Sequence, residues 1–355
     1  MPAEPLPTPF VAVDRAVLVD NIATMAARAE DLGVALRPHA KTHKSPAIAR
    51  RQVQAGAAGL TVATMAEAEV FARYGVDDLF IAYPLWLSHE SAHRLEHLLA
   101  DGVRLRVGVD SAEGARMLGA VAPHDLLSVA VEVDSGQHRS GVSAGDAARV
   151  AVAAAEAGLT VDGVFTFPGH SYAPGAARSA AADEARALAE ASEGLRAAGL
   201  DPWLRSGGST PSAAAVEAGA LTELRPGVYV FGDAQQWELG TCTPEQISLT
   251  VHSTVVSHAG GRLILDAGSK SIGADRPAWA SGHGRLLDHP DARIVQISEH
   301  HAVVEGVTPL PPLGSRVRVV PNHVCMCVNN VDTLFVLDEG VPGDNWPVAA
   351  RGANT

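Results

Sequence analysis

The chain has 355 residues, 47% of them hydrophobic, so it is long enough for about two domains or for one large barrel with an appended domain. Its formal net charge of −13 argues against a nucleic-acid-binding surface, because such domains usually carry a basic face. No apolar run reaches the ~18 residues that span a bilayer, the N-terminus lacks the features of a signal peptide, and the three cysteines do not make a disulfide framework. We therefore expect a soluble cytoplasmic protein with neither a nucleic-acid nor a membrane partner.

Strand-like and helix-like segments alternate along the first two thirds of the chain. A strand is predicted at Phe10–Asp14, and the apolar spacing of Arg15–Leu32 predicts a helix. Eight further strand-like runs follow, at 34–38, 59–64, 79–85, 105–110, 128–134, 163–169, 203–209 and 223–232. Segments rich in helix formers lie between them, at 45–56, 66–74, 88–99, 112–121, 145–157 and 176–198. This alternation predicts an α/β fold with a (β/α)8 TIM-type barrel, and a doubly wound sheet is the alternative.

The pattern changes near residue 240. Five strand-like runs follow, at 248–258, 262–266, 292–298, 316–320 and 333–337. Glycine- and proline-rich turns separate them and helical periodicity is absent, which predicts a mostly antiparallel β domain. We assign residues 15–240 to the barrel, and residues 1–14 and 241–355 to the β domain.

Two of the three lysines lie in one basic turn. The lysines are Lys41, Lys44 and Lys270, and the first two belong to the segment Arg37-Pro-His-Ala-Lys-Thr-His-Lys44. This segment follows the first barrel strand, so Lys41 lies at the carboxyl end of a strand, where parallel α/β proteins bind ligands. A partly buried lysine can lose its proton and form a Schiff base with a carbonyl group. The alternative is an ordinary solvated turn.

A loop of small residues, Gly207-Gly208-Ser209-Thr210, follows the seventh barrel strand. Glycines allow backbone N–H groups to approach an anion, and hydroxyl groups add further donors. Because phosphate sites in barrels recur after strands seven and eight, we expect a phosphate loop here. An ordinary tight turn is the alternative.

Three potential metal ligands, His323, Cys325 and Cys327, are spaced two residues apart. In a strand they would point to one face. Imidazole and thiolate together favour zinc or another borderline divalent ion. Since no other cysteine is nearby, an open site completed by outside ligands or water is the form we expect. The alternative is that the two cysteines are ordinary buried side chains.

A Schiff-base lysine, a phosphate loop and a β domain together suggest pyridoxal phosphate. Over nearly its whole length the chain resembles the metal-activated, alanine-racemase-like pyridoxal enzymes that include D-serine dehydratase and D-threonine aldolase. The most specific markers of this resemblance are the segments 37–44, 131–141, 265–270 and 321–325.

The resemblance implies a role for each cofactor-site residue. Lys41 would hold the cofactor covalently and act as the catalytic residue, Arg139 would lie against the pyridoxal ring and its phenolic oxygen, and Tyr172 would line the site. The implied phosphate-binding residues are Gly207, Gly208, Ser209 and Thr210, with Tyr229 beside them.

The resemblance also implies that His323 and Cys325 bind a divalent metal, with zinc favoured and manganese or magnesium as alternatives. Cys327 has no counterpart in the family and is expected to be structural. Asp266 and Lys270 lie in a family marker without an assigned role.

The implied substrates are small D-3-hydroxy amino acids. A His-x-Cys pair follows the dehydratase pattern, so the resemblance favours D-serine dehydratase-type β-elimination to a 2-oxo acid and ammonia. The alternative is D-threonine aldolase-type retro-aldol cleavage to glycine and an aldehyde. A non-catalytic pyridoxal phosphate carrier would lack the β domain, and an alanine racemase would need a tyrosine there, whereas residues 241–355 contain none. Analogy with related enzymes implies a homodimer.

Overall fold

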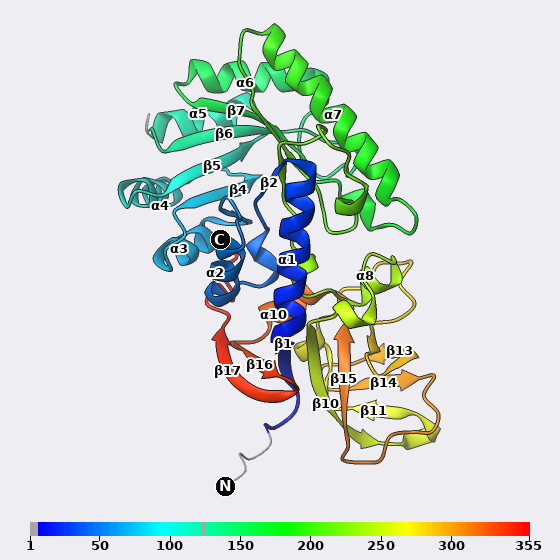
Figure 1. Ribbon diagram of the computed structural model, residues 1–355. Coiled ribbons are helices and arrows are strands. Elements are labelled where there is room, and N and C mark those ends of the chain that lie inside the picture. Colours follow the sequence, from blue (N-terminus) through cyan, green and yellow to red (C-terminus); the bar gives the residue numbers. More distant parts are fainter. Residues whose placement is uncertain (1–5, 122–124) are drawn as a thin grey trace. The chain divides into compact units, whose positions relative to one another are not determined.

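The computed structural model describes residues 6–121 and 125–355 of the chain (Figure 1). These residues fall into two compact units. The barrel unit comprises the described residues of 24–41, 49–227 and 353–355, and the sheet unit comprises those of 1–23, 42–48 and 228–352. The predicted domain boundary is residue 240, whereas the units change at 227/228. The side-chain amide of Asn21 donates to the carbonyl groups of Val230 and Gln246 over 3.3 and 2.9 Å, which ties the segment after residue 227 to the sheet unit.

The barrel unit contains eight parallel strands in the order β2-β9-β8-β7-β6-β5-β4-β3. A parallel bridge between His39 and Thr61 links the two ends of this sheet, and Thr61 N–H donates to the carbonyl of Pro38 over 2.8 Å. The predicted TIM-like α/β fold is thereby confirmed. The strands are β2 (Ala35–Leu36), β3 (Leu60–Val62), β4 (Asp78–Pro84), β5 (Arg104–Val109), β6 (Leu127–Glu132), β7 (Thr160–Phe165), β8 (Leu204–Gly207) and β9 (Glu223–Leu224).

Some barrel strands are shorter than their apolar runs. The sequence predicts one strand over 223–232, but β9 ends at Leu224 and a 3₁₀ turn follows at Val228–Val230. Pro226 lies between them and has no N–H to donate to a neighbouring strand, so the ladder stops there.

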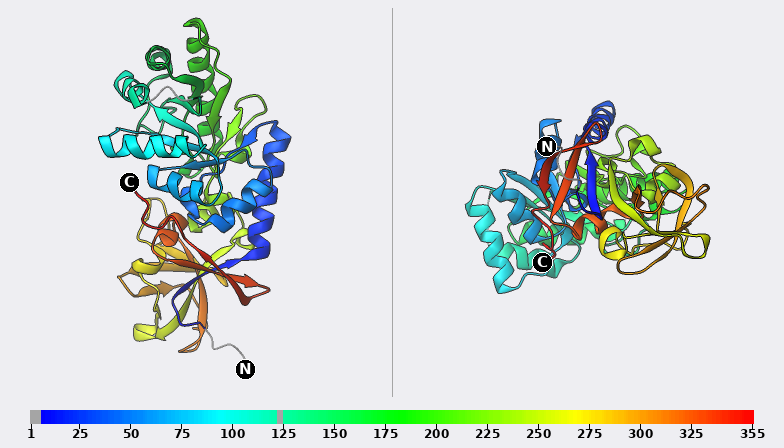
Figure 2. Two further views of the ribbon diagram at one scale, coloured as in Figure 1. Left: turned by 90° about the vertical axis from the view of Figure 1, so that its left-hand side faces the viewer. Right: turned by 90° about the horizontal axis from the view of Figure 1, so that it is seen from below.

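Helices cover the outer face of the barrel sheet (Figures 1 and 2). Several begin at polar caps: Thr64 accepts a hydrogen bond from Glu67 N–H at the start of α3, and Ser88 and Ser91 form a capping box at the start of α4. Among the described residues, no helix is both long enough and apolar enough to cross a membrane. The first eight helices are α1 (Arg15–Leu32), α2 (Pro46–Gln54), α3 (Met65–Arg73), α4 (His89–Ala100), α5 (Ala112–Val121), α6 (Ala147–Glu156), α7 (Ala177–Ala197) and α8 (Ala234–Glu238).

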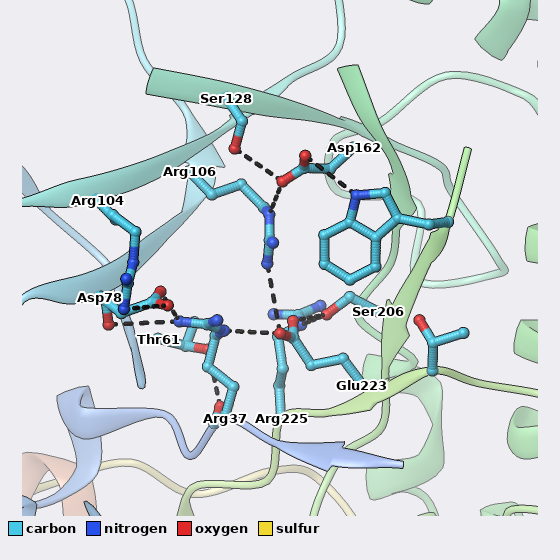
Figure 3. Close-up of polar contacts among 12 residues, drawn as sticks. Arg37, Thr61, Asp78, Arg104, Arg106, Ser128, Asp162, Ser206, Glu223 and Arg225 are labelled. Atoms are coloured by element: carbon cyan, nitrogen blue, oxygen red, sulfur yellow. Dashed lines mark hydrogen bonds and ion pairs between the residues drawn. The ribbon is translucent and has the colours of Figure 1, made fainter. Parts of the chain in front are cut away.

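A polar layer crosses the inside of the barrel, and each of the eight strands supplies one residue to it, within the strand or next to it (Figure 3). Its members, in strand order, are Arg37, Thr61, Asp78, Arg106, Ser128, Asp162, Ser206 and Glu223. At its centre Glu223 accepts from Arg37 Nε over 2.7 Å and from an Arg106 nitrogen over 3.3 Å. Arg106 Nε also donates to Asp162 over 2.6 Å. Burial alone would raise the pKa of Glu223, but Arg37 and Arg106 outweigh it and lower that pKa, so the buried charges are paired.

The sheet unit is built on nine strands in the order β11-β14-β13-β12-β15-β10-β1-β16-β17, with an additional pairing between β10 and β11. All pairings are antiparallel except that of β1 with β16, so the predicted mostly antiparallel β domain is confirmed. The strands are β1 (Phe10–Asp14), β10 (Leu249–Ser257), β11 (Leu263–Leu265), β12 (Gly284–Leu286), β13 (His289–Ile297), β14 (Ala302–Glu305), β15 (Arg316–Pro321), β16 (Thr333–Asp338) and β17 (Val341–Pro347).

The prediction of a β domain without helices is wrong in two places. Short helices form at α9 (Ser269–Ile272) and α10 (Val324–Asn329). The strand β15 ends at Pro321, one residue beyond its predicted end, and α10 begins three residues later. The buried carboxylate of Asp233 accepts a hydrogen bond from Val324 N–H over 3.2 Å and thereby satisfies one of the open donors of the helix.

Candidate active site

Lys41 lies in a 3₁₀ turn, Ala40–Thr42, which follows the first barrel strand as predicted. Its Nζ is 5.6 Å from the ring centroid of Phe167, and Arg139 Cζ is 5.3 Å from the same centroid. The ring of Tyr172 is 6.2 Å from the Phe167 ring, centroid to centroid. The barrel therefore brings three predicted site residues together from the ends of different strands.

Phe167 is a residue that sequence reasoning missed. It lies just beyond the end of β7, so its place at the carboxyl end of a barrel strand was the available signal. Two cationic side chains over one ring make cation–π contacts and give this part of the barrel a positive field. Such a field favours an anionic ligand.

The turn that carries Arg139 is held by Asp134. The Oδ1 atom of Asp134 accepts from the N–H groups of Gly136 and His138 over 2.9 and 3.0 Å. Burial raises the pKa of Asp134, but these hydrogen bonds outweigh burial and lower that pKa. Arg139 itself is 3.9 Å from the carboxylate of Glu132, a distance that leaves the guanidinium loosely held. Burial raises the pKa of Glu132.

Two glycines, Gly207 at the end of β8 and Gly208 directly after it, lie close to buried side chains. A Cβ atom at Gly207 would lie 2.2 Å from Glu184 Oε1, and one at Gly208 would lie 2.2 Å from Leu224 Cδ1. Gly208 also has φ +82°, which non-glycine residues rarely adopt. Its N–H donates to Glu184 Oε1 over 2.6 Å. The expectation that the glycine N–H groups face a bound phosphate is therefore wrong for Gly208, because the buried carboxyl group of Glu184 already accepts that bond.

Hydroxyl groups join this loop to the segment that carries Tyr172. Ser209 Oγ is 2.8 Å from Ser171 Oγ and 2.9 Å from Ser212 Oγ. Ser171 directly precedes Tyr172 in the chain. Two glycines packed against buried side chains and flanked by clustered hydroxyl groups fit a phosphate group, and Ser209 and Thr210 are the hydroxyl residues of this loop.

The predicted metal ligands and Tyr229 belong to the sheet unit, whereas Lys41, Arg139, Tyr172 and the residues 207–210 belong to the barrel unit. Tyr229 lies in the 3₁₀ turn Val228–Val230 and is 8% exposed. The predicted site residues are thus divided between the two units.

His323 directly precedes α10, and its Nδ1 is 3.1 Å from Asp275 Oδ2. A carboxylate at one ring nitrogen orients the imidazole and leaves the other nitrogen for a metal. Burial lowers the pKa of His323, but Cys325, Asp275 and Asp233 together raise it to about 11. The carboxylates of Asp275 and Asp233 favour a cation at this ring, which also suits a metal ion.

The two cysteines have different surroundings, so they do not share one face with His323 as they could in a strand. Because the segment is helical, residues two apart point to different sides. Cys325 is half-buried, with its Sγ 3.4 Å from Thr42 Oγ1. Cys327 is buried with its Sγ 3.2 Å from the carbonyl of Ser271, and burial raises its pKa to about 12.

Within residues 6–121 and 125–355 no group of three or more His, Cys, Asp or Glu side chains has the geometry of a metal cluster. The donor set of one imidazole and one thiol fits an open site that keeps positions for outside ligands, and it does not fit a closed structural site. Asp233 and Asp275, which surround this pair, were not selected by the sequence analysis; neither adjoins the motif in the chain.

The marker segment 265–270 serves the sheet unit. Asp266 Oδ1 accepts from Ser253 Oγ over 2.6 Å and from Thr254 N–H over 2.8 Å, so it fastens β10 to the end of β11. Lys270 forms an ion pair with Glu299 at 2.7 Å in which both side chains are exposed.

The chain combines a TIM-like barrel with an antiparallel sheet. The barrel carries a lysine after its first strand and a glycine–hydroxyl loop after its seventh. Together these features define the class of fold-type III pyridoxal phosphate enzymes. Two family models match this chain: "Alanine racemase, N-terminal domain" over residues 13–235 and "Putative serine dehydratase domain" over residues 248–337. The chain belongs to the alanine racemase-like family of D-serine dehydratase and D-threonine aldolase.

Known relatives are similar along most of the chain. D-threo-3-hydroxyaspartate dehydratase of Delftia sp. (strain HT23) is 35% identical and the match covers 90% of this chain and 91% of that protein. D-threonine aldolase of Arthrobacter sp. is also 35% identical, over 99% of this chain and 95% of that one. A solved structure of the dehydratase, a Cys-to-Ala mutant in the metal-free form, has a TM-score of 0.88 at 32% identity and covers 96% of this chain and 97% of that one.

Proposed function

We propose that the chain is a pyridoxal phosphate- and divalent-metal-dependent lyase that acts on D-3-hydroxy amino acids. The observation that carries this proposal is the gathering of Lys41, Arg139 and Tyr172 around Phe167, at the carboxyl ends of barrel strands. The relatives that are 35% identical over most of the chain are a dehydratase and an aldolase for such amino acids.

Pyridoxal phosphate, when bound, supplies an electron sink for the bond broken at the α-carbon, and a divalent metal supplies a Lewis acid for the β-hydroxyl group. Lys41 binds the cofactor and moves the proton at the α-carbon. Arg139 and Tyr172 orient the ring, and the 207–210 loop binds the phosphate. His323 and Cys325 hold the metal, with Asp275 orienting the imidazole.

We propose elimination in preference to aldol cleavage. In elimination the α-proton and the β-hydroxyl group leave as water, and hydrolysis of the resulting imine consumes one water and gives a 2-oxo acid and ammonia. The reason is the ligand pair His323 and Cys325, because a His-x-Cys pair follows the dehydratase pattern. Its thiolate also favours zinc over manganese or magnesium, which prefer oxygen ligands. Retro-aldol cleavage, with proton removal from the β-hydroxyl group, is the second candidate, and the aldolase relative of equal identity favours it.

D-Threonine separates the two reactions, because each gives different products from it. The chain is assayed with pyridoxal phosphate and Zn²⁺ or Mn²⁺. Elimination gives 2-oxobutanoate and ammonia, which we expect, and cleavage gives glycine and acetaldehyde, which would establish the second candidate. Lys41→Ala should abolish either activity together with the absorption of the bound cofactor, whereas Lys270→Ala, in an exposed ion pair, should retain both. If no D-3-hydroxy amino acid reacts, the proposed function is wrong.

We also propose that the enzyme is a homodimer, on the analogy of related barrel enzymes. Sedimentation velocity of the full chain tests this, and a monomer with full specific activity would contradict it.

A further inference from the structure

A buried carboxyl group lies directly behind the glycine loop. Glu184, in α7, is 1% exposed, and its Oε1 accepts from Gly208 N–H over 2.6 Å. A Cβ atom at Gly207 would collide with the same oxygen, so the carboxyl group packs against both glycines. Among the residues that the structure describes, its other oxygen, Oε2, is buried and has no hydrogen-bond partner. None of the catalytic roles above uses this group.

Within residues 6–121 and 125–355, the charged groups near Glu184 do not neutralise it by an ion pair. Arg225, after β9, is the cation whose charge lowers the pKa of Glu184. Its guanidinium, however, donates to Ser206 Oγ over 2.7 Å and to the carbonyl of Thr166. Glu223 and Glu132 also face Arg225 and share its charge. On α7 itself, Asp183 pairs with Arg186 and His170 instead.

Burial raises the pKa of Glu184 to about 7, against the lowering effects of the Gly208 N–H and of Arg225. Near neutral pH the group therefore exists in both forms. A phosphate dianion held by this loop would disfavour the ionised carboxylate further, because like charges repel in a low-dielectric interior. The protonated form keeps the bond to Gly208 through its carbonyl oxygen and carries the proton on the oxygen that now has no partner.

We propose that Glu184 is a positioning residue of the 207–210 loop and takes up one proton from solvent when a phosphate monoester binds there. This inference rests on the proposed function, which assigns the cofactor phosphate to this loop. The uptake is expected above pH 7, where the free protein has mostly lost this proton. Because binding then requires a proton, the affinity for the phosphate monoester should fall as the pH rises, by up to about tenfold per pH unit.

The test uses pyridoxamine 5′-phosphate, which has no aldehyde and forms no Schiff base with Lys41. Its binding to the full chain freed of cofactor is measured by calorimetry at pH 8 in two buffers of different ionisation enthalpy, which gives the number of protons taken up. The wild type should take up a substantial fraction of a proton, and Glu184→Gln should take up none while binding within about threefold at pH 6.5. Glu190→Gln, an exposed position on the same helix, should behave as the wild type.

The possible results separate this inference from the proposed function. Equal proton uptake by Glu184→Gln and the wild type would overturn the role of Glu184 and leave the enzyme assignment intact. Equal affinities for pyridoxamine and pyridoxamine 5′-phosphate would show that the 207–210 loop does not bind the phosphate, and would overturn the proposed cofactor site. If Glu184→Gln does not fold, the infrared difference spectrum of the wild type decides: a protonated carboxyl band should appear on binding, and its absence would contradict the inference.

Discussion

The Nδ1 atom of His323 and the Oδ2 atom of Asp275 lie 3.1 Å apart, although 48 positions separate the two residues in the chain. The interaction orients the imidazole ring at the start of a short helix. A carboxylate in this position is the usual companion of a histidine that binds a metal through its other nitrogen.

Asp275→Asn should weaken metal binding by about 10–100-fold, because the neutral amide no longer makes the imidazole a better donor. Competition with a chelator, for Zn²⁺ and Mn²⁺ separately, measures the affinity. Asp288→Asn is the matched control, since Asp288 is a half-exposed carboxylate of the same unit that pairs with Arg318. An unchanged metal affinity in Asp275→Asn would rule out the orienting role.

The two cysteines should respond differently to substitution. Cys325→Ala should remove the bound metal and the lyase activity while the chain stays folded. Cys327→Ala should keep the metal stoichiometry and lower the free energy of unfolding by about 1 kcal/mol, because its thiol packs inside the sheet unit. Elemental analysis and urea denaturation give the two quantities. Loss of metal in Cys327→Ala would show that this cysteine is a ligand.

Gly208→Ala should reduce cofactor affinity and stability, since the new methyl group meets Leu224 and the residue needs φ +82°. Gly175→Ala separates the two causes: Gly175 has φ +75°, but a methyl group added there would have no other atom within 4 Å. The control should therefore lose only the backbone component, about 1 kcal/mol. Thermal unfolding and pyridoxamine 5′-phosphate titration measure both. Equal effects in the two variants would contradict the steric argument.

Glu223→Gln should lower the free energy of unfolding of the barrel unit by about 3–5 kcal/mol, because it leaves Arg37 and Arg106 with too little negative charge in a buried layer. Asp77→Asn is the control, since Asp77 lies 4.0 Å from Arg104 with an exposed side chain and should contribute less than about 1 kcal/mol. Urea denaturation measures both. A small effect at Glu223 would mean that the layer relaxes around the lost charge.

The contribution of Glu223 should also depend on pH. Its pKa is lowered in the folded state, where Arg37 and Arg106 outweigh the effect of burial. The stabilisation is therefore fully present above the unfolded pKa of about 4.3 and is lost as the pH falls through the lower folded value. The difference in unfolding free energy between the wild type and Glu223→Gln should thus be constant at neutral pH and shrink in acid. A difference that grows on acidification would contradict the pairing.

Much of the site could be predicted from order along the chain. Lys41 stands out because a strand precedes it and a helix follows it, and the 207–210 loop stands out because it follows the seventh strand. Both inferences need only local periodicity and the rule that ligands bind at the carboxyl ends of parallel strands. The importance of Phe167 and Glu184 could not be inferred in this way, since each acts through contacts with residues from other strands or helices.

By itself, the sequence determined the two kinds of architecture, because burial on one face of a strand or helix imposes a period that is visible in the residues. The conformation of the segment after Pro321 was decided only by the tertiary structure. Alternation there allowed a strand. Asp233, 91 positions before Val324, instead accepts a hydrogen bond from Val324 N–H at the start of a helix. In this helix Cys325 and Cys327 point to different sides. Local periodicity reports which positions are buried, and it carries no information about which distant side chain meets an open backbone donor.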